Sequence, residues 1–213
     1  MHIPNQVLSC PVTYASAAAA SGGVILAIRR LKEFKWRENA KTICALFAFI
    51  FVVQMVDVQI PGGTTAHFFG GMLAALIVGP MAATILMASI LIAQCAFLHD
   101  GGFTALGANI LNMAVIGPWA GWAAYQMLAR HASSRAARAA ALFAASWVSI
   151  VVSAGACALE LAASGPMPIV GSLTAMAGTH AIVGLGEGLL TVACAGLASI
   201  AAPSLASLVA RSR

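Results

Sequence analysis

Histidine at position 2 makes the start of this sequence a candidate metal chelator. The amine of Met1, the backbone nitrogen of His2 and the His2 imidazole can close two adjacent chelate rings on one metal ion. The three nitrogens then share a plane and leave a fourth position open. Such a set suits Ni²⁺ or Cu²⁺, whereas Zn²⁺ prefers a tetrahedron and Mg²⁺ or Ca²⁺ prefer oxygen. Because the nitrogens must lose their protons, we expect binding to weaken at acid pH.

His67 is the candidate for the fourth ligand. It follows the turn-rich segment 61–66, and we expect it at the outer start of a third apolar helix, on the same side of the membrane as Met1. A histidine at a helix start can equally be a cap or a packing residue. The presence of His2 favours the metal interpretation.

Four more polar residues lie in expected helices and are candidates to support the histidines. His180 and Glu187 are seven residues apart and share a helix face. An ionisable residue within a span is costly unless it is paired or faces a polar cavity, so they are candidates to hold the N-terminal segment. Asn109 and Asn112 also share a face and are candidates for hydrogen bonds around the metal ligands. For both pairs, structural contacts between helices are the alternative.

The elements that must position these residues are transmembrane helices. The mean hydropathy is +0.94, with 61% hydrophobic and 8% charged residues, whereas about a quarter of a soluble protein is charged. A spanning helix needs roughly 20 apolar residues. The sequence predicts an all-α membrane protein, one integral-membrane domain over residues 1–213, with seven transmembrane helices. The apolar runs are 12–28, 42–58, 66–79, 81–98, 103–128, 139–163 and 172–202.

The basic residues predict the orientation of the bundle. All 11 Lys and Arg residues fall in segments 29–41, 130–138 and 211–213. Basic loops face the cytoplasm, so we expect cytoplasmic loops at about 29–41 and 130–138, an external N-terminus and a cytoplasmic C-terminus. The first apolar run lacks the preceding basic region of a signal peptide, so we expect it to be retained. The basic residues form no phosphate-binding stripe, which argues against nucleic acid as a partner.

The outer side collects carboxylates without any basic residue. Asp57, Asp100 and Glu160 lie near the outer ends of the expected helices. An unopposed acidic face attracts cations, although ordinary solvated loop carboxylates are the alternative. His99 with Asp100 is either a solvated turn or a relay for metal, and His131 is interpreted as a loop residue. The five scattered cysteines, without C-x-x-C spacing, are interpreted as small packing residues.

Several motifs are absent from the sequence. There is no G-x-x-x-x-G-K-[ST] phosphate loop, no H-E-x-x-H and no Ser–His–acid arrangement. We therefore expect neither an enzyme nor an ATPase. For an intramembrane enzyme, His180 with Glu187 is the single candidate pair, and it lacks a nucleophile.

Three motifs carry a resemblance to a known family. The sequences M-H-I-P at 1–4, P-G-G-T-T-A-H-F-F-G-G at 61–71 and D-G-G-F-T-A-L-G-A-N-I-L-N-M-A-V-I-G-P at 100–118 resemble the NikM/CbiM family, with Thr179 and His180 extending the match. These are substrate-binding (S) components of energy-coupling factor (ECF) transporters for nickel and cobalt. The resemblance implies a seven-helix subunit whose N-terminal segment, residues 1–11, dips into the bundle. It implies metal ligation by Met1, His2 and His67.

The family also implies partners and a location. Such systems need a transmembrane coupling (T) subunit, a pair of cytoplasmic ATP-binding cassette ATPases and often a small auxiliary membrane subunit, in the cytoplasmic (inner) membrane. The metal is then cargo, and no cofactor is expected. The segment 63–67 resembles the nickel branch, so Ni²⁺ is favoured over Co²⁺. A stand-alone secondary permease for nickel or cobalt is the alternative, but its expected H-x-x-x-x-D motif is absent.

The sequence departs from the family pattern at a few positions. Asn5 and Gln6 stand where Asp-Gly is frequent, Asp57 where Asn is common, and His99 where Gly is usual. These departures bear on substrate tuning more than on the fold.

Overall fold

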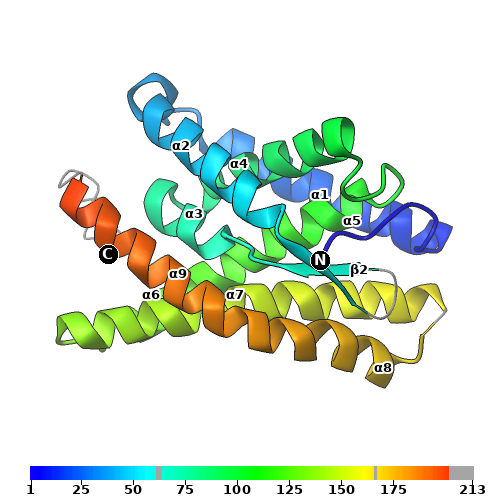
Figure 1. Ribbon diagram of the computed structural model, residues 1–213. Coiled ribbons are helices and arrows are strands. Elements are labelled where there is room, and N and C mark those ends of the chain that lie inside the picture. The colour runs from blue at the N-terminus through cyan, green and yellow to red at the C-terminus, as the bar shows by residue number, and fades with distance from the viewer. Residues whose placement is uncertain (61–63, 166, 202–213) are drawn as a thin grey trace.

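The computed structural model describes residues 1–60, 64–165 and 167–201, which form a helical bundle (Figure 1). Residues 61–63 of the second motif, Pro166 and the basic Arg211 and Arg213 lie outside the described residues. The α-helices are α1 Cys10–Arg30, α2 Trp36–Gln54, α3 Gly71–Val78, α4 Pro80–Ala93, α5 Leu106–Ile110, α6 Gly117–Ala129, α7 Arg135–Ser164, α8 Ile169–Leu173 and α9 Thr179–Ala201. The π-helical turns are η1 Gln94–Leu98, η2 Leu111–Ile116 and η3 Thr174–Gly178, and the strands are β1 Asp57–Ile60 and β2 Thr64–His67.

The described helices include four that are long and apolar enough to cross a membrane. They are Cys10–Arg30, Pro80–Leu98, Arg135–Ser164 and Ile169–Ala198. Large apolar side chains also remain exposed on the long helices, among them Leu159, Ile182 and Leu189. A multi-pass helical membrane protein is confirmed, whereas the seven crossings and the sides of the two termini stay predictions.

Proline and glycine set the ends of several helices. Proline occupies the first turn of α1 and α4, where its missing N–H costs nothing. Gly79, at φ 83°, separates α3 from α4. By contrast, α4, α5 and α8 continue directly into the π turns η1, η2 and η3. Because η2 and η3 also run directly into α6 and α9, these eight elements form three longer helices in the described part of the chain.

The predicted helix over residues 66–79 is wrong in its first part. His67 lies on β2, which pairs with β1 in an antiparallel hairpin that sets Asp57 opposite His67 and Val58 opposite Ala66. Helix α3 begins only at Gly71, after Gly70 has turned the chain at φ 77°. The apolar run continues without a break from the strand into the helix, which concealed the boundary. The fold is therefore helical with one small hairpin, not strictly all-α.

Packing places the hairpin and the chain start inside the bundle. Helix α7 packs along α6 and α9, and α1 packs on α4 and α5. The N-terminus lies beside β2 in Figure 1. Met1 and Ile3 belong to the same buried core cluster as Phe69 and Ile150. The first residues of the chain are thus core residues.

Two of the departures from the family pattern have a backbone explanation. In the described part of the chain, Gln6 at φ 65° and His99 at φ 56° are the non-glycine residues with positive φ. Glycine reaches this left-handed region without the steric cost of a Cβ. In this chain, the two positions where the resemblance leads us to expect glycine therefore have left-handed backbones.

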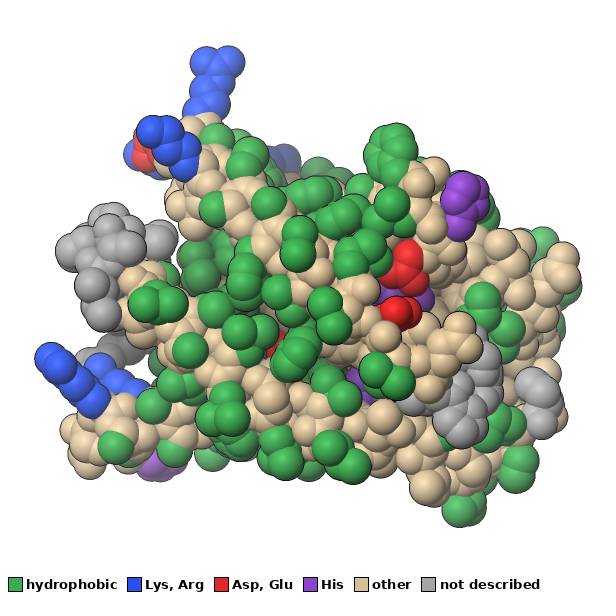
Figure 2. Space-filling model, viewed as in Figure 1, with side chains coloured by type: hydrophobic (Ala, Val, Ile, Leu, Met, Phe, Trp, Pro, Cys, Tyr) green, Lys and Arg blue, Asp and Glu red, His purple; other side chains and the backbone are tan. Residues whose placement is uncertain are grey.

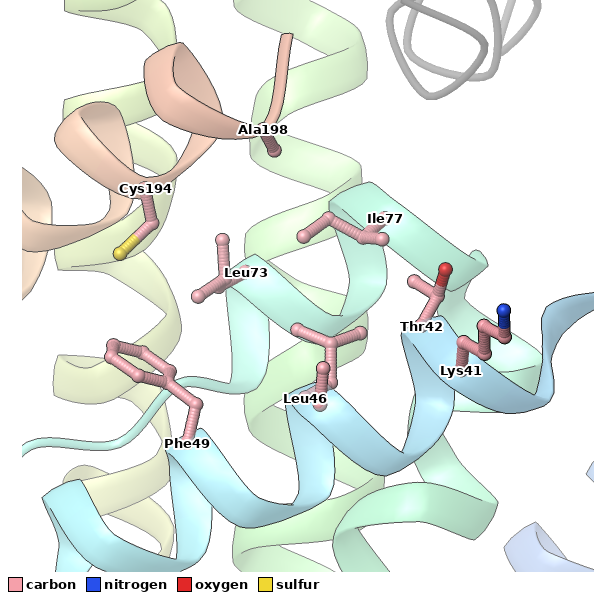
Figure 3. Close-up of a pocket in the computed structure, with 9 residues that line it drawn as sticks. Lys41, Thr42, Leu46, Phe49, Leu73, Ile77, Cys194 and Ala198 are labelled. Atoms are coloured by element: carbon pink, nitrogen blue, oxygen red, sulfur yellow. The ribbon is translucent and has the colours of Figure 1, made fainter. Parts of the chain in front are cut away.

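An apolar groove lies between α2, α3 and α9, with a volume of about 380 Å³ (Figure 3). Leu46, Phe49, Leu73 and Ile77 line it, and Lys41 lies at one end. None of the residues predicted to bind metal lines this groove. The candidate site is elsewhere, in the packed interior.

Candidate metal site

The N-terminal segment is held in the bundle by backbone hydrogen bonds around Ile3. Met1, His2 and Ile3 are buried, with 1%, 4% and 0% of their surface exposed. The Ile3 N–H donates to Asn109 Oδ1 at 2.9 Å, and the Asn109 amide donates to the Ile3 carbonyl at 3.1 Å. Gly102 donates its N–H to the same carbonyl at 2.9 Å. Asn109, predicted to support the site, thus fixes the segment that carries His2.

The loop after η1 receives the segment as it leaves the interior. Asn5 Oδ1 accepts hydrogen bonds from the Thr104 N–H at 3.0 Å and the Thr104 hydroxyl at 3.1 Å. A Cβ on Gly102 would lie 2.2 Å from the Asn5 nitrogen. Only glycine allows the two backbones to approach this closely, which explains its place in the motif that begins at Asp100.

The Met1 amine faces strand β2. It donates to the Thr65 carbonyl and lies 3.4 Å from the Thr65 hydroxyl. Burial lowers the pKa of this amine from 8.0 to about 5. The amine is therefore neutral at pH 7 and has a lone pair.

His2 and His67 meet in the interior although 65 positions separate them. Their rings are stacked, with centroids 4.7 Å apart and 23° between the planes. His67 Nδ1 lies 2.6 Å from the Phe68 carbonyl, which can only accept, so Nδ1 carries the proton. His67 Nε2 then bears the lone pair, and it is buried without a hydrogen-bond partner among the described residues.

The His2 ring has one partner on each side. Nε2 lies 3.2 Å from Gln94 Oε1. Nδ1 lies 3.3 Å from Asp100 Oδ1, which is within ion-pair distance. The two atoms are not aligned for a hydrogen bond. Burial lowers the pKa of His2 to about 3 and that of His67 well below 6.5. Both rings are neutral at pH 7, so the contact with Asp100 is one between a carboxyl group and an uncharged ring.

The donor set is one amine and two imidazoles. Within residues 1–60, 64–165 and 167–201, no three His, Cys, Asp or Glu side chains gather as a metal cluster. A metal ion at this place would need the terminal amine and backbone nitrogen in addition to the two rings. An arrangement rich in nitrogen suits Ni²⁺, Cu²⁺ and Co²⁺ better than Mg²⁺ or Ca²⁺.

Glu187 and His180 have separate roles despite their shared helix. Glu187 accepts hydrogen bonds from the backbone N–H groups of Phe69 at 2.9 Å and Gly70 at 2.8 Å. Its hydrogen bonds thereby fix the turn that follows His67. His180 Nδ1 lies 2.7 Å from the Met176 carbonyl, so its buried Nε2 bears the lone pair.

Asn112 does not share the hydrogen-bond partner of Asn109. Its amide donates to Glu160 Oε2 at 2.5 Å, and the Ser16 hydroxyl donates to Glu160 Oε1 at 2.6 Å. These bonds tie η2 and α1 to α7. Glu160 is thus half-buried and hydrogen-bonded between helices, and it is not a solvated loop carboxylate.

Two further residues of the site, Gln54 and Gln94, are not among those predicted from the sequence. Both are 0% exposed, and Gln94 contacts His2 directly. The sequence does contain a feature that indicates them, because each is a lone amide in an otherwise apolar run. A polar side chain in such a run needs a hydrogen-bond partner.

Charge is unevenly distributed over the surface. Figure 2 shows Lys and Arg side chains toward the left end of the visible face and acidic side chains beside a histidine at a hollow toward the right. Asp57, opposite His67 in the hairpin, is exposed. Negative charge thus lies next to the histidines, as expected for attraction of a cation.

The fold and the site define a multi-pass helical membrane protein with a buried, nitrogen-lined site at its N-terminus. Residues 2–205 match the family described as the cobalt uptake substrate-specific transmembrane region, CbiM. The chain belongs to this CbiM/NikM family of nickel and cobalt transport proteins.

Relatives match most of the chain. A putative fused nickel transport protein NikMN of Archaeoglobus fulgidus is 36% identical over 96% of this chain and 68% of its own length. A putative metal transport protein of Haloquadratum walsbyi is 31% identical over 96% of this chain and 93% of its own. The match to the fused nickel transport protein NikMN of Rhodobacter capsulatus, 42% identical, spans only 38% of that protein.

Solved structures share the fold. A crystal structure of a transition metal transporter superposes with a TM-score of 0.88 at 28% identity, over 94% of this chain and 93% of the other. A truncated transition metal transporter gives 0.85 at 30% identity, over 91% of this chain and 96% of the other.

Proposed function

We propose that this chain is the substrate-specific binding subunit of an ECF-type ATP-driven importer and captures Ni²⁺ from the extracytoplasmic side. The observation that carries the proposal is the meeting of the buried Met1 amine, the His2 ring and the His67 ring. Each group is neutral at pH 7, and His2 Nδ1 and His67 Nε2 are buried without a hydrogen-bond partner among the described residues. The ion would be cargo, held until it passes inward.

The preference for Ni²⁺ rests on the donor set. The Met1 amine, the His2 amide nitrogen, His2 Nδ1 and His67 Nε2 would supply four nitrogens, and a planar nitrogen set favours Ni²⁺. The Archaeoglobus and Rhodobacter relatives are nickel transport proteins by name. Co²⁺ is the competing cargo, since other relatives are cobalt transport proteins by name.

The orientation and partners follow from the charge pattern and the family. The basic side chains toward one end support a cytoplasmic face there and an external N-terminus. The membrane would be the cytoplasmic (inner) membrane. The sequence has no phosphate loop, so ATPase subunits and a coupling subunit would supply the energy. This chain would contribute selectivity and would not act as an enzyme.

Calorimetry with visible absorption on the purified protein tests the proposal. We expect tight Ni²⁺ binding with a square-planar band, lost in His2→Ala, in His67→Ala and in a variant with one residue added before Met1. The exposed His99→Ala serves as the matched histidine control and should bind normally. Binding that survives the added residue would refute the chelate.

A further inference from the structure

Two buried glutamines connect His2 to the turn that follows β2. Gln54 ends α2 and Gln94 begins η1, and both are 0% exposed. Gln94 Oε1 lies 3.2 Å from His2 Nε2, and the Gln94 amide donates to Gln54 Oε1 at 3.0 Å. The Gln54 amide in turn donates to the Phe69 carbonyl at 2.7 Å. The contacts form one continuous chain.

The direction of every hydrogen bond in this chain is fixed from its far end. The Phe69 carbonyl can only accept, so Gln54 must turn its NH₂ group toward it and its oxygen toward Gln94. Gln94 must then donate to that oxygen and present its own oxygen to the ring of His2. A nitrogen that faces an oxygen acceptor must carry a proton, and here that nitrogen is His2 Nε2.

We infer that Gln54 and Gln94 are positioning residues that hold neutral His2 with its proton on Nε2, and so keep Nδ1 free to bind the metal. A neutral imidazole has one N–H, so a proton on Nε2 leaves the lone pair on Nδ1. Nδ1 is the ring nitrogen close enough to the His2 backbone to close the chelate ring. The inference rests on the proposed function, since it assigns these residues to the same site.

A carboxyl group next to His2 favours the opposite tautomer, with the proton on Nδ1. Asp100 Oδ1 lies 3.3 Å from His2 Nδ1, and the charge of this carboxyl group attracts a proton to that nitrogen. A proton there would block the chelate. Gln94 disfavours this tautomer, because an unprotonated Nε2 would face the Gln94 oxygen without a hydrogen between them.

The same turn orients His67. The Phe68 carbonyl accepts from His67 Nδ1, and the Phe69 carbonyl ends the chain from His2. Two neighbouring carbonyls therefore determine the protonated nitrogen on both histidines. Each ring is left with its unprotonated nitrogen buried and without a hydrogen-bond partner in the described part of the chain.

Nitrogen NMR of metal-free protein labelled with ¹⁵N-histidine tests the inference at pH 8. The His2 signals are assigned by their loss in His2→Ala. Wild type should show a protonated Nε2 and an unprotonated Nδ1. Gln94→Leu and Gln54→Leu should move proton population to Nδ1, although Gln54 does not touch His2. Gln94→Glu should keep the wild-type pattern, because a carboxyl oxygen still accepts from Nε2.

A matched control and a second measurement separate tautomer control from general damage. Gln59→Leu changes an exposed amide on β1 and should leave His2 unchanged. We expect Gln54→Leu to weaken Ni²⁺ binding about 10- to 100-fold, as loss of an outer-sphere partner does. A protonated Nδ1 in wild type, or an unchanged His2 in both Leu variants, overturns the inference.

The two proposals can fail separately. The tautomer is measured without metal, so wild type that shows a protonated Nε2 but binds no Ni²⁺ refutes the proposed function and supports the inference on His2. Ni²⁺ binding through His2 with a protonated Nδ1 in the metal-free protein refutes the inference alone. If the Leu variants do not fold, wild type and Gln94→Glu still decide it.

Discussion

Gly102 donates its N–H to the Ile3 carbonyl at 2.9 Å, and no side chain fits between the two backbones. A Cβ at Gly102 would lie 2.2 Å from the Asn5 nitrogen and 2.5 Å from the Pro4 carbonyl carbon. Since both neighbours are backbone atoms, they cannot yield by a rotamer change. The docking of the whole N-terminal segment therefore depends on this contact.

Gly102→Ala should expel the N-terminal segment and abolish Ni²⁺ binding while the helices stay folded. Calorimetry measures the binding, and circular dichroism in detergent measures the helices. Gly155→Ala on α7 is the control, because a Cβ there meets nothing within 4 Å. Normal binding by Gly102→Ala would show that the segment does not need this fit.

Ni²⁺ binding should release about one proton between pH 6 and 8. The pKa of the docked Met1 amine is lowered to about 5 and that of His2 to about 3, so both are already neutral and only the His2 amide proton must leave. The affinity should then fall about tenfold per pH unit, and more steeply below about pH 5, where the amine also gains a proton. Calorimetry in buffers of different ionisation enthalpy counts the protons. An amine with its ordinary pKa of 8.0 would instead make the count two at pH 6.5.

The docking of the segment has the same sign of pH dependence. An undocked amine, with its ordinary pKa of 8.0, binds more protons than the docked amine between about pH 5 and 8. Docking is therefore favoured fully above pH 8 and loses free energy as the pH falls toward 5. Protease access to the N-terminus should rise over that window.

Glu187→Ala should destabilise the protein and weaken Ni²⁺ binding together. The carboxyl group accepts from Phe69 and Gly70 just after His67, and loss of both bonds should cost on the order of 3 kcal/mol in the free energy of unfolding. Glu187→Gln keeps one oxygen and should lose less. The control Glu38→Ala removes an exposed ion pair with Lys35 and should change stability by less than about 0.5 kcal/mol. Unfolding midpoints in detergent measure both, and equal effects would contradict the role of Glu187.

Glycine at the two left-handed turns should stabilise the protein. Gln6→Gly and His99→Gly remove a strained Cβ at φ 65° and 56°, and each should add about 0.5–1 kcal/mol after the entropy cost of glycine is subtracted. Gln59→Gly, in the extended strand β1, should instead lose about 0.5–1 kcal/mol. A loss of stability in both turn variants would show that these residues form contacts that outweigh the strain.

The sequence predicted the helical membrane class from hydropathy. It also predicted the pairing of His2 with His67, because the basic loops predict that both segments lie on one side of the membrane. It did not predict the hairpin, because the strand residues before His67 merge with the apolar run of α3. Nor did it predict the partners of Glu187, which are backbone N–H groups 117 and 118 positions away. Hydrogen bonds between distant segments depend on packing, which a single sequence does not encode as a local pattern.

The π turns make the alignment of the site sensitive to chain length. Gln94 begins η1, Asn112 lies in η2, and the carbonyl that holds His180 belongs to η3. A π turn accommodates one residue more than an α turn, so deletion of a single residue there would restore α geometry and rotate one part of the helix by about 100° against the other. A deletion of that kind would turn the amide of Gln94 away from His2 while leaving the helix intact. In this bundle the number of residues in three short turns, and not only their chemical identity, sets which side chains face the interior.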